Sequence, residues 1–356
     1  MADISVIIPC YNAASYIDRC LTTITSQTIG IDALEIICID DASIDDTWER
    51  LQIWESNYPD HIILVHCNEN GRQGTARNIG LQYASSDWVA FIDSDDWVEL
   101  DYFEILYQKA IQDEYDVVAC QGIRDFSTSA CFLAPNERKS NKDNRSMLID
   151  TVEKRKIFIV LQSMGLYAWG KLIRKDLLVK NELFFPCNLA YEDCFWGSLL
   201  HFYSTKIYIF GDNLYHYFVN GTSTVLQKNT DYHLDCLTVN YMKWKEWIRR
   251  GLLDQYRKEF EFDFLFTGYL GFFKALVLRF SEPSYSYYLL LKELTSSLIP
   301  DYQQNQYILE GLDPFYRTLL ESLKLPLNKA QFQQLAKSAE SYWNPTHNSH
   351  LTPSQE

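Results

Sequence analysis

The sequence contains no run of about 18 uncharged apolar residues, the length that a helix needs to cross a membrane. The nearest approach, residues 264–278, is shorter and includes Lys274. The first apolar run, residues 4–8, lacks the length and the basic flank of a signal peptide. Nine cysteines form no C-x-x-C pair, and their odd number is typical of reduced thiols. We therefore expect a cytoplasmic protein without a membrane span.

Positive charge is scarce in the first part of the chain. Residues 1–125 hold 6 basic and 23 acidic side chains, a balance of 6 − 23 = −17, whereas the rest of the 356 residues hold 26 basic and 24 acidic ones. Because nucleic-acid binding requires clustered Lys and Arg, we expect no nucleic-acid partner. Most of these carboxylates are expected on a solvated surface, and a few are candidates to hold a cation.

Apolar runs alternate with helical stripes through the first 120 residues. The runs predict strands at 4–8, 35–39, 62–66, 88–92 and 116–120, and the stripes predict helices near 17–24, 47–58, 76–83 and 102–113. This alternation predicts an α/β fold with a doubly wound, mainly parallel sheet and helices on both faces. Several runs are continuously apolar, as strands buried on both faces should be.

The remaining residues predict a different organisation. Residues 127–150 are polar and predict a surface loop, 151–225 mix helix and strand signals, and about 230–342 are helical throughout. We therefore expect an α/β domain over 1–225 with halves 1–125 and 126–225. An all-helical domain should follow over 226–343, and a disordered tail over 344–356.

Polar clusters directly follow three of the predicted strands. They are residues 9–12, 40–43 and 93–96. In an open α/β sheet, ligands bind beyond the carboxyl ends of the strands, near the point where the strand order reverses. Asp93 and Asp95 supply the hard oxygen ligands that Mg²⁺ and Mn²⁺ prefer, and such a cation would neutralise a bound diphosphate.

Two other enzyme classes fit these clusters poorly. A dinucleotide-binding dehydrogenase requires G-x-G-x-x-G after its first strand, where this chain has Pro-Cys-Tyr-Asn. A phosphatase with an aspartate nucleophile places its D-x-D on the first strand, whereas here it follows the fourth. Both classes are therefore disfavoured, and the strand-end carboxylates remain candidates to hold a cation that neutralises a diphosphate.

Four segments resemble the family 2 glycosyltransferases, which are inverting GT-A enzymes of bacterial polysaccharide synthesis. They occur in the family's order and spacing and are Ser5–Asn12, Ile39–Thr47, Gly74–Gly80 and Phe91–Asp96. The resemblance is strong over 1–125 and moderate over about 165–225. It implies that the first half binds a nucleotide-sugar donor, with a UDP-sugar expected, and that the second half holds the acceptor and the catalytic base.

The resemblance also implies roles for individual residues. The implied nucleotide-sugar-binding residues are Pro9, Tyr11, Asn12, Asp41, Arg77, Asp93 and Ser94. Asp41 would accept the uracil N–H beside Tyr11, and Asp95, together with Asp93, would bind Mn²⁺ or Mg²⁺. Simpler roles stay open, because Asp40 or Asp41 could cap the next helix and Arg77 could be a surface helix residue.

In the second half, Glu192 and Asp193 resemble the family's E-D segment, in which the Asp is the catalytic base. This segment should open a helix running to Phe202, although both acids could simply be charges at a helix N-terminus. Residues 169–174 resemble the family's W-N-K-L-x-R stretch, with Gly170 in place of Asn. Residues 215–224 resemble a loop over the diphosphate but lack its frequent Arg. His216 is a candidate third metal ligand, although a lone His among aromatic residues is usually structural.

The sequence therefore predicts a metal-dependent inverting glycosyltransferase that acts on a glycan or a lipid-linked glycan. A sugar nucleotidyltransferase and a non-catalytic carbohydrate-binding protein of the same fold are the alternatives. The former usually carries a Gly-rich basic loop after strand one, and that loop is absent here. The C-terminal helices could form a homodimer or contact the inner face of the cell membrane peripherally.

Overall fold

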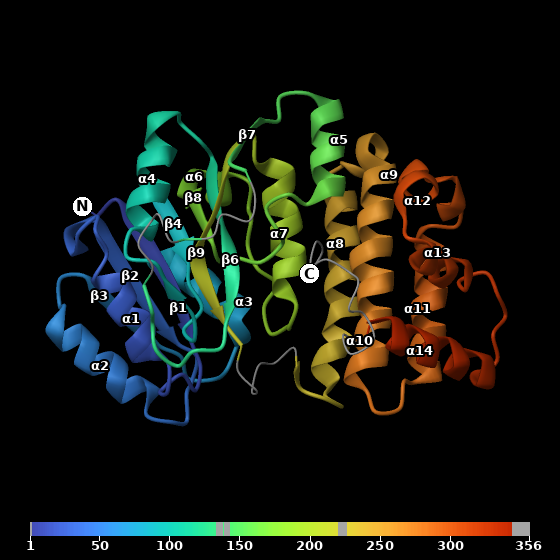
Figure 1. Cartoon of the computed structure of the whole chain (residues 1–356), viewed down its shortest axis with the longest axis horizontal. Helices are drawn as coiled ribbons and strands as arrows, with labels where there is room; N and C mark the ends of the chain where they lie inside the picture. The colour runs from blue at the N-terminus through green and yellow to red at the C-terminus, as the bar shows by residue number, and fades with distance from the viewer. Residues whose placement is uncertain (1, 133–137, 139–142, 220–225, 344–356) are drawn as a thin grey trace. The chain divides into compact units, whose positions relative to one another are not determined.

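The computed structural model describes residues 2–132, 138, 143–219 and 226–343 (Figure 1). The expected tail at 344–356 and residues 220–224 of the expected segment 215–224 lie outside these residues. The chain forms two compact units, Met1–Gly221 and Thr222–Glu356. No helix in the described part of the chain is both long enough and apolar enough to span a membrane.

The first unit is built on one mixed sheet. Its strands are β1 (Ile4–Cys10), β2 (Leu34–Asp40), β3 (Ile62–His66), β4 (Trp88–Phe91), β5 (Trp97–Val98), β6 (Val117–Asp125), β7 (Arg145–Leu148), β8 (Lys171–Arg174) and β9 (Lys206–Phe218). The order is β3-β2-β1-β4-β8-β6-β9-β5, with β7 paired to β9. Strands β1 to β4 pair in parallel as predicted, whereas β8 runs antiparallel between β4 and β6.

The strand order reverses beside β1. The chain passes from β1 outward to β2 and β3 and then returns to the other side of β1 as β4. The paired stretch of β1 and β4 ends at Ile7 and Phe91, whereas β1 stays paired with β2 through Cys10. Pro9 lies beyond the residues paired with β4, where its missing N–H removes no ladder bond. A crevice of the kind that binds ligands in α/β sheets is therefore expected between the ends of β1 and β4.

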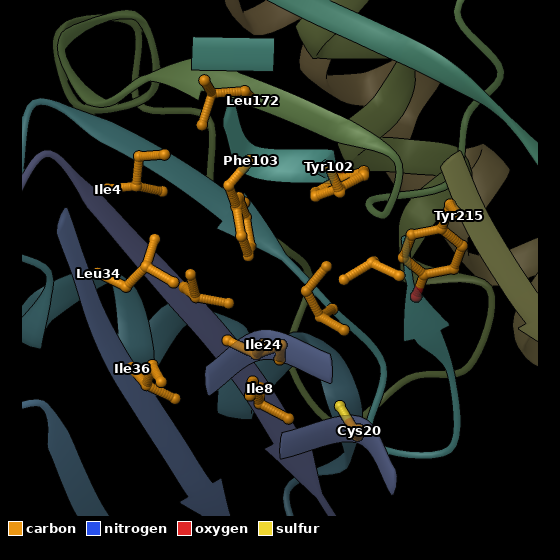
Figure 2. Close-up of a cluster of buried hydrophobic side chains, with 14 of the residues drawn as sticks. Ile4, Ile8, Cys20, Ile24, Leu34, Ile36, Tyr102, Phe103, Leu172 and Tyr215 are labelled. Atoms are coloured by element: carbon orange, nitrogen blue, oxygen red, sulfur yellow. The ribbon is translucent and has the colours of Figure 1, made fainter. Parts of the chain in front are cut away.

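Helices cover both faces of the sheet. The helices of this unit are α1 (Ile17–Thr25), α2 (Thr47–Asn57), α3 (Arg72–Tyr83), α4 (Tyr102–Gln112), α5 (Val152–Leu161), α6 (Lys175–Lys180) and α7 (Glu192–Tyr203). Side chains of α1 and α4 pack with Val6 and Ile8 in the cluster of Figure 2. Alternate residues face the other side, where Ile7 lies against Gly80 of α3 and Phe91 against Trp196 of α7.

The polar segment 127–150 departs from its predicted loop. Residues 145–148 form β7, an edge strand antiparallel to β9. Their sequence, Arg-Ser-Met-Leu, has too few apolar residues to signal a strand, and pairing with the long strand β9 overrides that local preference. The prediction of a loop was therefore wrong for these four residues.

The second unit is helical in its described residues, as the sequence predicts. Its longer helices are α8 (Asp235–Arg249), α9 (Leu253–Asp263), α10 (Gly271–Arg279), α11 (Tyr285–Leu298), α12 (Gln306–Gly311), α13 (Pro314–Glu321) and α14 (Lys329–Trp343). A π-helical segment, Phe264–Leu270, joins α9 to α10. Aromatic rings fill the interior, and Trp247 stacks on Phe260 with ring centroids 4.3 Å apart.

Candidate active site

The turns after β1 and β2 are joined by hydrogen bonds. The backbone N–H of Asn12 donates to Ser43 Oγ (3.0 Å), and the Ile44 N–H donates to Asn12 Oδ1 (2.9 Å). Asn12 adopts a left-handed conformation (φ 50°), which Asn tolerates better than most residues. Beside it Tyr11 is 49% exposed, so it is available to a ligand rather than packed in the core.

Asp41 is buried at the same edge of the sheet. Its Oδ1 accepts the N–H of Gly71 (2.8 Å), and its carbonyl accepts the side-chain amide of Asn70 (3.2 Å). Burial raises the pKa of Asp41, and the N–H groups of Gly71 and Arg72 oppose that shift. Asp40 instead pairs with His66, at 2.7 Å between Oδ2 and Nδ1. Helix α2 begins only at Thr47, and none of these bonds caps it.

The turn after β4 gathers Asp93, Ser94, Asp95 and Asp96. The Asp96 N–H donates to the Asp93 carbonyl (3.0 Å), and Arg19 donates to the Asp95 carbonyl (2.5 Å). Ser94 and Asp95 are half-buried, whereas Asp96 is fully buried. The pKa of Asp96 is raised well above its usual range, first by burial and then by the charges of Asp95 and Asp93.

Arg77 of α3 is buried and joins this turn to α7. Its guanidinium binds Asp93 Oδ1 at 2.7 Å and Glu192 Oε1 at 2.5 Å, with its side chain 3% exposed. These two carboxylates together raise the pKa of Arg77, against the effect of burial. A surface role for Arg77 is therefore excluded, and the arginine connects the expected donor-binding half to the second half.

Asp193 follows Glu192 in the first turn of α7, the helix predicted to run to Phe202. Its Oδ1 accepts the backbone N–H of Cys194 (2.9 Å). Burial raises the pKa of Asp193, the charge of Arg77 opposes the shift, and the charge of Asp93 adds to it. Burial also raises the pKa of Glu192 to about 7. The first turn of α7 thus places two carboxyl groups with raised pKa values beside Asp93.

His216 does not join the acidic turn as a ligand. Its Nε2 lies 3.0 Å from Glu99 Oε1, its Nδ1 lies 3.4 Å from Asp125 Oδ2, and its ring stacks on Trp97. Both ring nitrogens are therefore engaged by carboxylates, which is the structural role. In the described residues, no three His, Cys, Asp or Glu side chains form a ready-made metal site.

The residues of the acidic turn nevertheless fit a divalent cation. Asp93 and Asp95 provide hard oxygen ligands, and their charges disfavour ionisation of Asp96. A cation at Asp95 and Asp93 would relieve that repulsion. Mg²⁺ commonly takes only one or two protein carboxylates and completes its shell with water and substrate phosphate, so a three-residue cluster is not required.

The backbone conformation at residue 170 explains why glycine can stand there in place of asparagine. It has φ +69°, a left-handed conformation that both Gly and Asn adopt more readily than other residues. Its carbonyl accepts the N–H of Cys120 (3.0 Å), which holds the loop against β6. The departure from the family's Asn at this position therefore preserves the backbone, with no side-chain contact needed to explain it.

The comparisons with known proteins agree with this geometry. Residues 5–168 match the model of glycosyl transferase family 2. Residues 5–168 thus have the sequence pattern of a family 2 glycosyltransferase. This stretch contains every motif of the first half, from Ser5 to Asp96, and ends before the helix that holds Asp193.

Two relatives extend the similarity of the glycosyltransferase domain. The uncharacterized glycosyltransferase YibD of Escherichia coli (strain K12) is 31% identical over 229 residues, 62% of each protein. The poly(ribitol-phosphate) beta-glucosyltransferase of Bacillus spizizenii (strain ATCC 23059 / NRRL B-14472 / W23) is 26% identical over 61% of this chain and 32% of its own length. The match thus spans less than two thirds of each relative.

Among solved structures, S. aureus TarS 1–349 in complex with UDP-GlcNAc matches with a TM-score of 0.64 and 18% identity. The match covers 96% of this chain and 91% of the TarS chain. At this identity the likeness concerns the fold, and it confirms the expected GT-A architecture with a helical C-terminal region.

Replacing Arg77 with Met should destabilise the protein strongly. The substitution leaves Asp93 and Glu192 without their shared cation, and removing one partner of a buried ion pair costs about 3–5 kcal/mol. Urea denaturation measures the change. Arg50→Met is the matched control, because Arg50 pairs with Asp18 at the surface. This variant should lose less than about 1 kcal/mol of its free energy of unfolding. Equal losses in the two variants would contradict the role of Arg77.

Glu192→Gln should make stability less dependent on pH. Glu192 has a raised pKa in the folded protein, so its contribution is complete below pH 4.5 and is lost as the pH rises through about 7. Between pH 5 and 8, the free energy of unfolding of the variant should therefore rise relative to that of the wild type, by on the order of 2 kcal/mol. Denaturation at several pH values checks this, with exposed Glu153→Gln as control. Parallel curves for Glu192→Gln and wild type would refute it.

Proposed function

We propose that the protein transfers a sugar, with inversion, from a nucleotide-sugar donor to a hydroxyl of a glycan or lipid-linked glycan in cell-surface polysaccharide synthesis. A UDP-sugar is the proposed donor. The observation that carries the proposal is the Arg77 bridge, because it brings the acidic turn after β4 and the first turn of α7 to one site. The family match and the named activities of the relatives support the same reaction class.

Donor binding is assigned to the ends of β1, β2 and β4. Asp41 has Oδ1 bound to Gly71, and its other oxygen is proposed to accept the base N–H beside the exposed ring of Tyr11. Pro9 and Asn12 shape the wall of this pocket, and Ser94 lies at its diphosphate end. Asp93 is fixed by Arg77, so it is presented in one orientation to the ribose or a cation.

Asp193 is proposed as the general base. Its pKa is raised by burial, which makes the carboxylate a better proton acceptor than a solvated one. It would take the proton of the acceptor hydroxyl while that oxygen attacks the anomeric carbon from the face opposite the diphosphate. Glu192 and Arg77 hold the first turn of α7 beside Asp93, which positions this base. A Mg²⁺ or Mn²⁺ ion at Asp95 and Asp93 would stabilise the leaving diphosphate.

A panel of nucleotide-sugars tests the proposed donor class. The protein is incubated with UDP-, GDP- and dTDP-sugars and Mn²⁺, and release of the nucleoside diphosphate is measured with and without a chelator. Release from a UDP-sugar that stops with the chelator supports the proposal. Release from GDP-sugars alone would overturn the UDP assignment, and release that ignores the chelator would overturn the metal.

Asp193→Asn should lower turnover at least about a hundredfold, because a general base contributes about 10²–10⁴-fold and an amide accepts no proton. The nucleotide should still bind with wild-type affinity, since Asp193 is assigned to the acceptor. Steady-state kinetics and calorimetry measure the two quantities. Full activity in this variant would exclude Asp193 as the base.

Asp95→Ala should abolish the metal-dependent part of nucleotide binding. The substitution removes the proposed direct ligand and leaves Asp41 and Tyr11 at the base unchanged. Calorimetric titration of UDP with Mn²⁺ and with a chelator separates the two contributions. Binding that still strengthens with Mn²⁺ to the wild-type extent would show that Asp95 holds no cation.

A further inference from the structure

The acidic turn is attached to β9 by a side chain outside the four motifs of the first half. The Tyr215 hydroxyl donates to Asp96 Oδ2 (2.6 Å) and accepts the backbone N–H of Asp93 (3.2 Å). Tyr215 is completely buried, so no water competes for these bonds. One hydroxyl therefore connects the first and last residues of the turn that contains Asp95.

A second bond from β9 reinforces the attachment. The backbone N–H of Phe218 donates to Asp96 Oδ1 (2.8 Å), so both oxygens of Asp96 are held by the same strand. Strand β5 pairs with β9 directly after the turn, with Val98 opposite Tyr215. Asp96 thus serves as the anchor of the turn that contains Asp93 and Asp95.

The ring of Tyr215 is itself immobilised. Trp169 stacks on it with centroids 4.5 Å apart and planes 13° apart, and Tyr167 stacks on Trp169 with centroids 3.8 Å apart. Trp169 lies directly on Gly122 of β6, where any Cβ would come within 2.5 Å of the ring. Figure 2 shows Tyr215 at the edge of the buried cluster. The ring and its hydroxyl are therefore held in place by packing of the loop 167–169, which is itself supported by β6.

We propose that Tyr215 is a positioning residue for the reaction: its hydroxyl fixes the turn from Asp93 to Asp96 so that Asp93 and Asp95 are presented together to a metal–diphosphate. The proposal rests on the proposed function for the identity of the ligand. Its geometric part, that the hydroxyl restrains the turn, holds for the protein without any ligand. These two parts are tested by separate measurements.

Tyr215→Phe removes the hydroxyl and keeps the stacked ring. The matched control is Tyr208→Phe, which deletes a hydroxyl from the same strand where its ring packs against Tyr115 and Phe210, away from the acidic turn. Both variants should fold, as judged by circular dichroism and melting temperature. Any loss confined to Tyr215→Phe is then a property of its hydroxyl.

Amide hydrogen exchange tests the restraint without a ligand. The Asp93 amide should exchange at least tenfold faster in Tyr215→Phe than in wild type, because it loses its acceptor, and Tyr208→Phe should match wild type. Unchanged exchange at Asp93 would overturn the positioning role, whatever the protein binds.

Calorimetry of UDP tests the consequence for the ligand. In Tyr215→Phe the dissociation constant with Mn²⁺ should rise at least tenfold, whereas the constant measured with a chelator should stay within twofold of wild type. Equal weakening in both conditions would show a general loss of the pocket and overturn the proposal. If wild type itself binds no UDP while Asp93 exchange responds as expected, the proposed donor fails and the restraint stands.

Discussion

The buried guanidinium of Arg77 is the interaction on which the rest of the site depends. It is the point where α3, the turn after β4 and the first turn of α7 meet, although these segments are separated by up to 115 positions in the chain. A buried arginine needs carboxylates or other acceptors around it, and a buried carboxylate needs a cation or hydrogen-bond donors. Each partner therefore fixes the others, and α7 has little freedom to move independently of the acidic turn.

The charges around Arg77 do not balance, and the imbalance has chemical consequences. Arg77 binds Asp93 and Glu192, while Asp193 lies close enough for its charge to act on Arg77 as well. One positive charge therefore serves several acids, and burial raises the pKa of both Glu192 and Asp193. A site arranged in this way raises the proton affinity of its carboxylates and favours an incoming cation. Both properties suit the displacement of a diphosphate by a deprotonated hydroxyl.

The sequence carried enough signal to predict the parallel half of the sheet. Continuous apolar runs mark β1 to β4 because buried parallel strands need little else, and polar residues directly after them mark the ligand edge. Strand β8 was not predicted between β4 and β6, because insertion order depends on pairing between distant segments. Strand β7 was missed because an edge strand requires few apolar residues. The Arg77 bridge and the Tyr215 hydroxyl were missed for a related reason, since neither partner's sequence reveals the other.

These two missed contacts show that the segments before and after residue 125 hold each other in place. The motifs place donor binding before that point and the base after it, and the acidic charge of the sequence changes there as well. Yet Asp93 is held by Arg77 from the first part and by Tyr215 from the second, and Asp96 is bound entirely by β9. The turn that contains the proposed metal ligands is therefore held in part by β9, a strand that lies beyond residue 125. A shift of α7 would act on Asp93 through Arg77, so the proposed base and the proposed donor-binding turn are mechanically coupled.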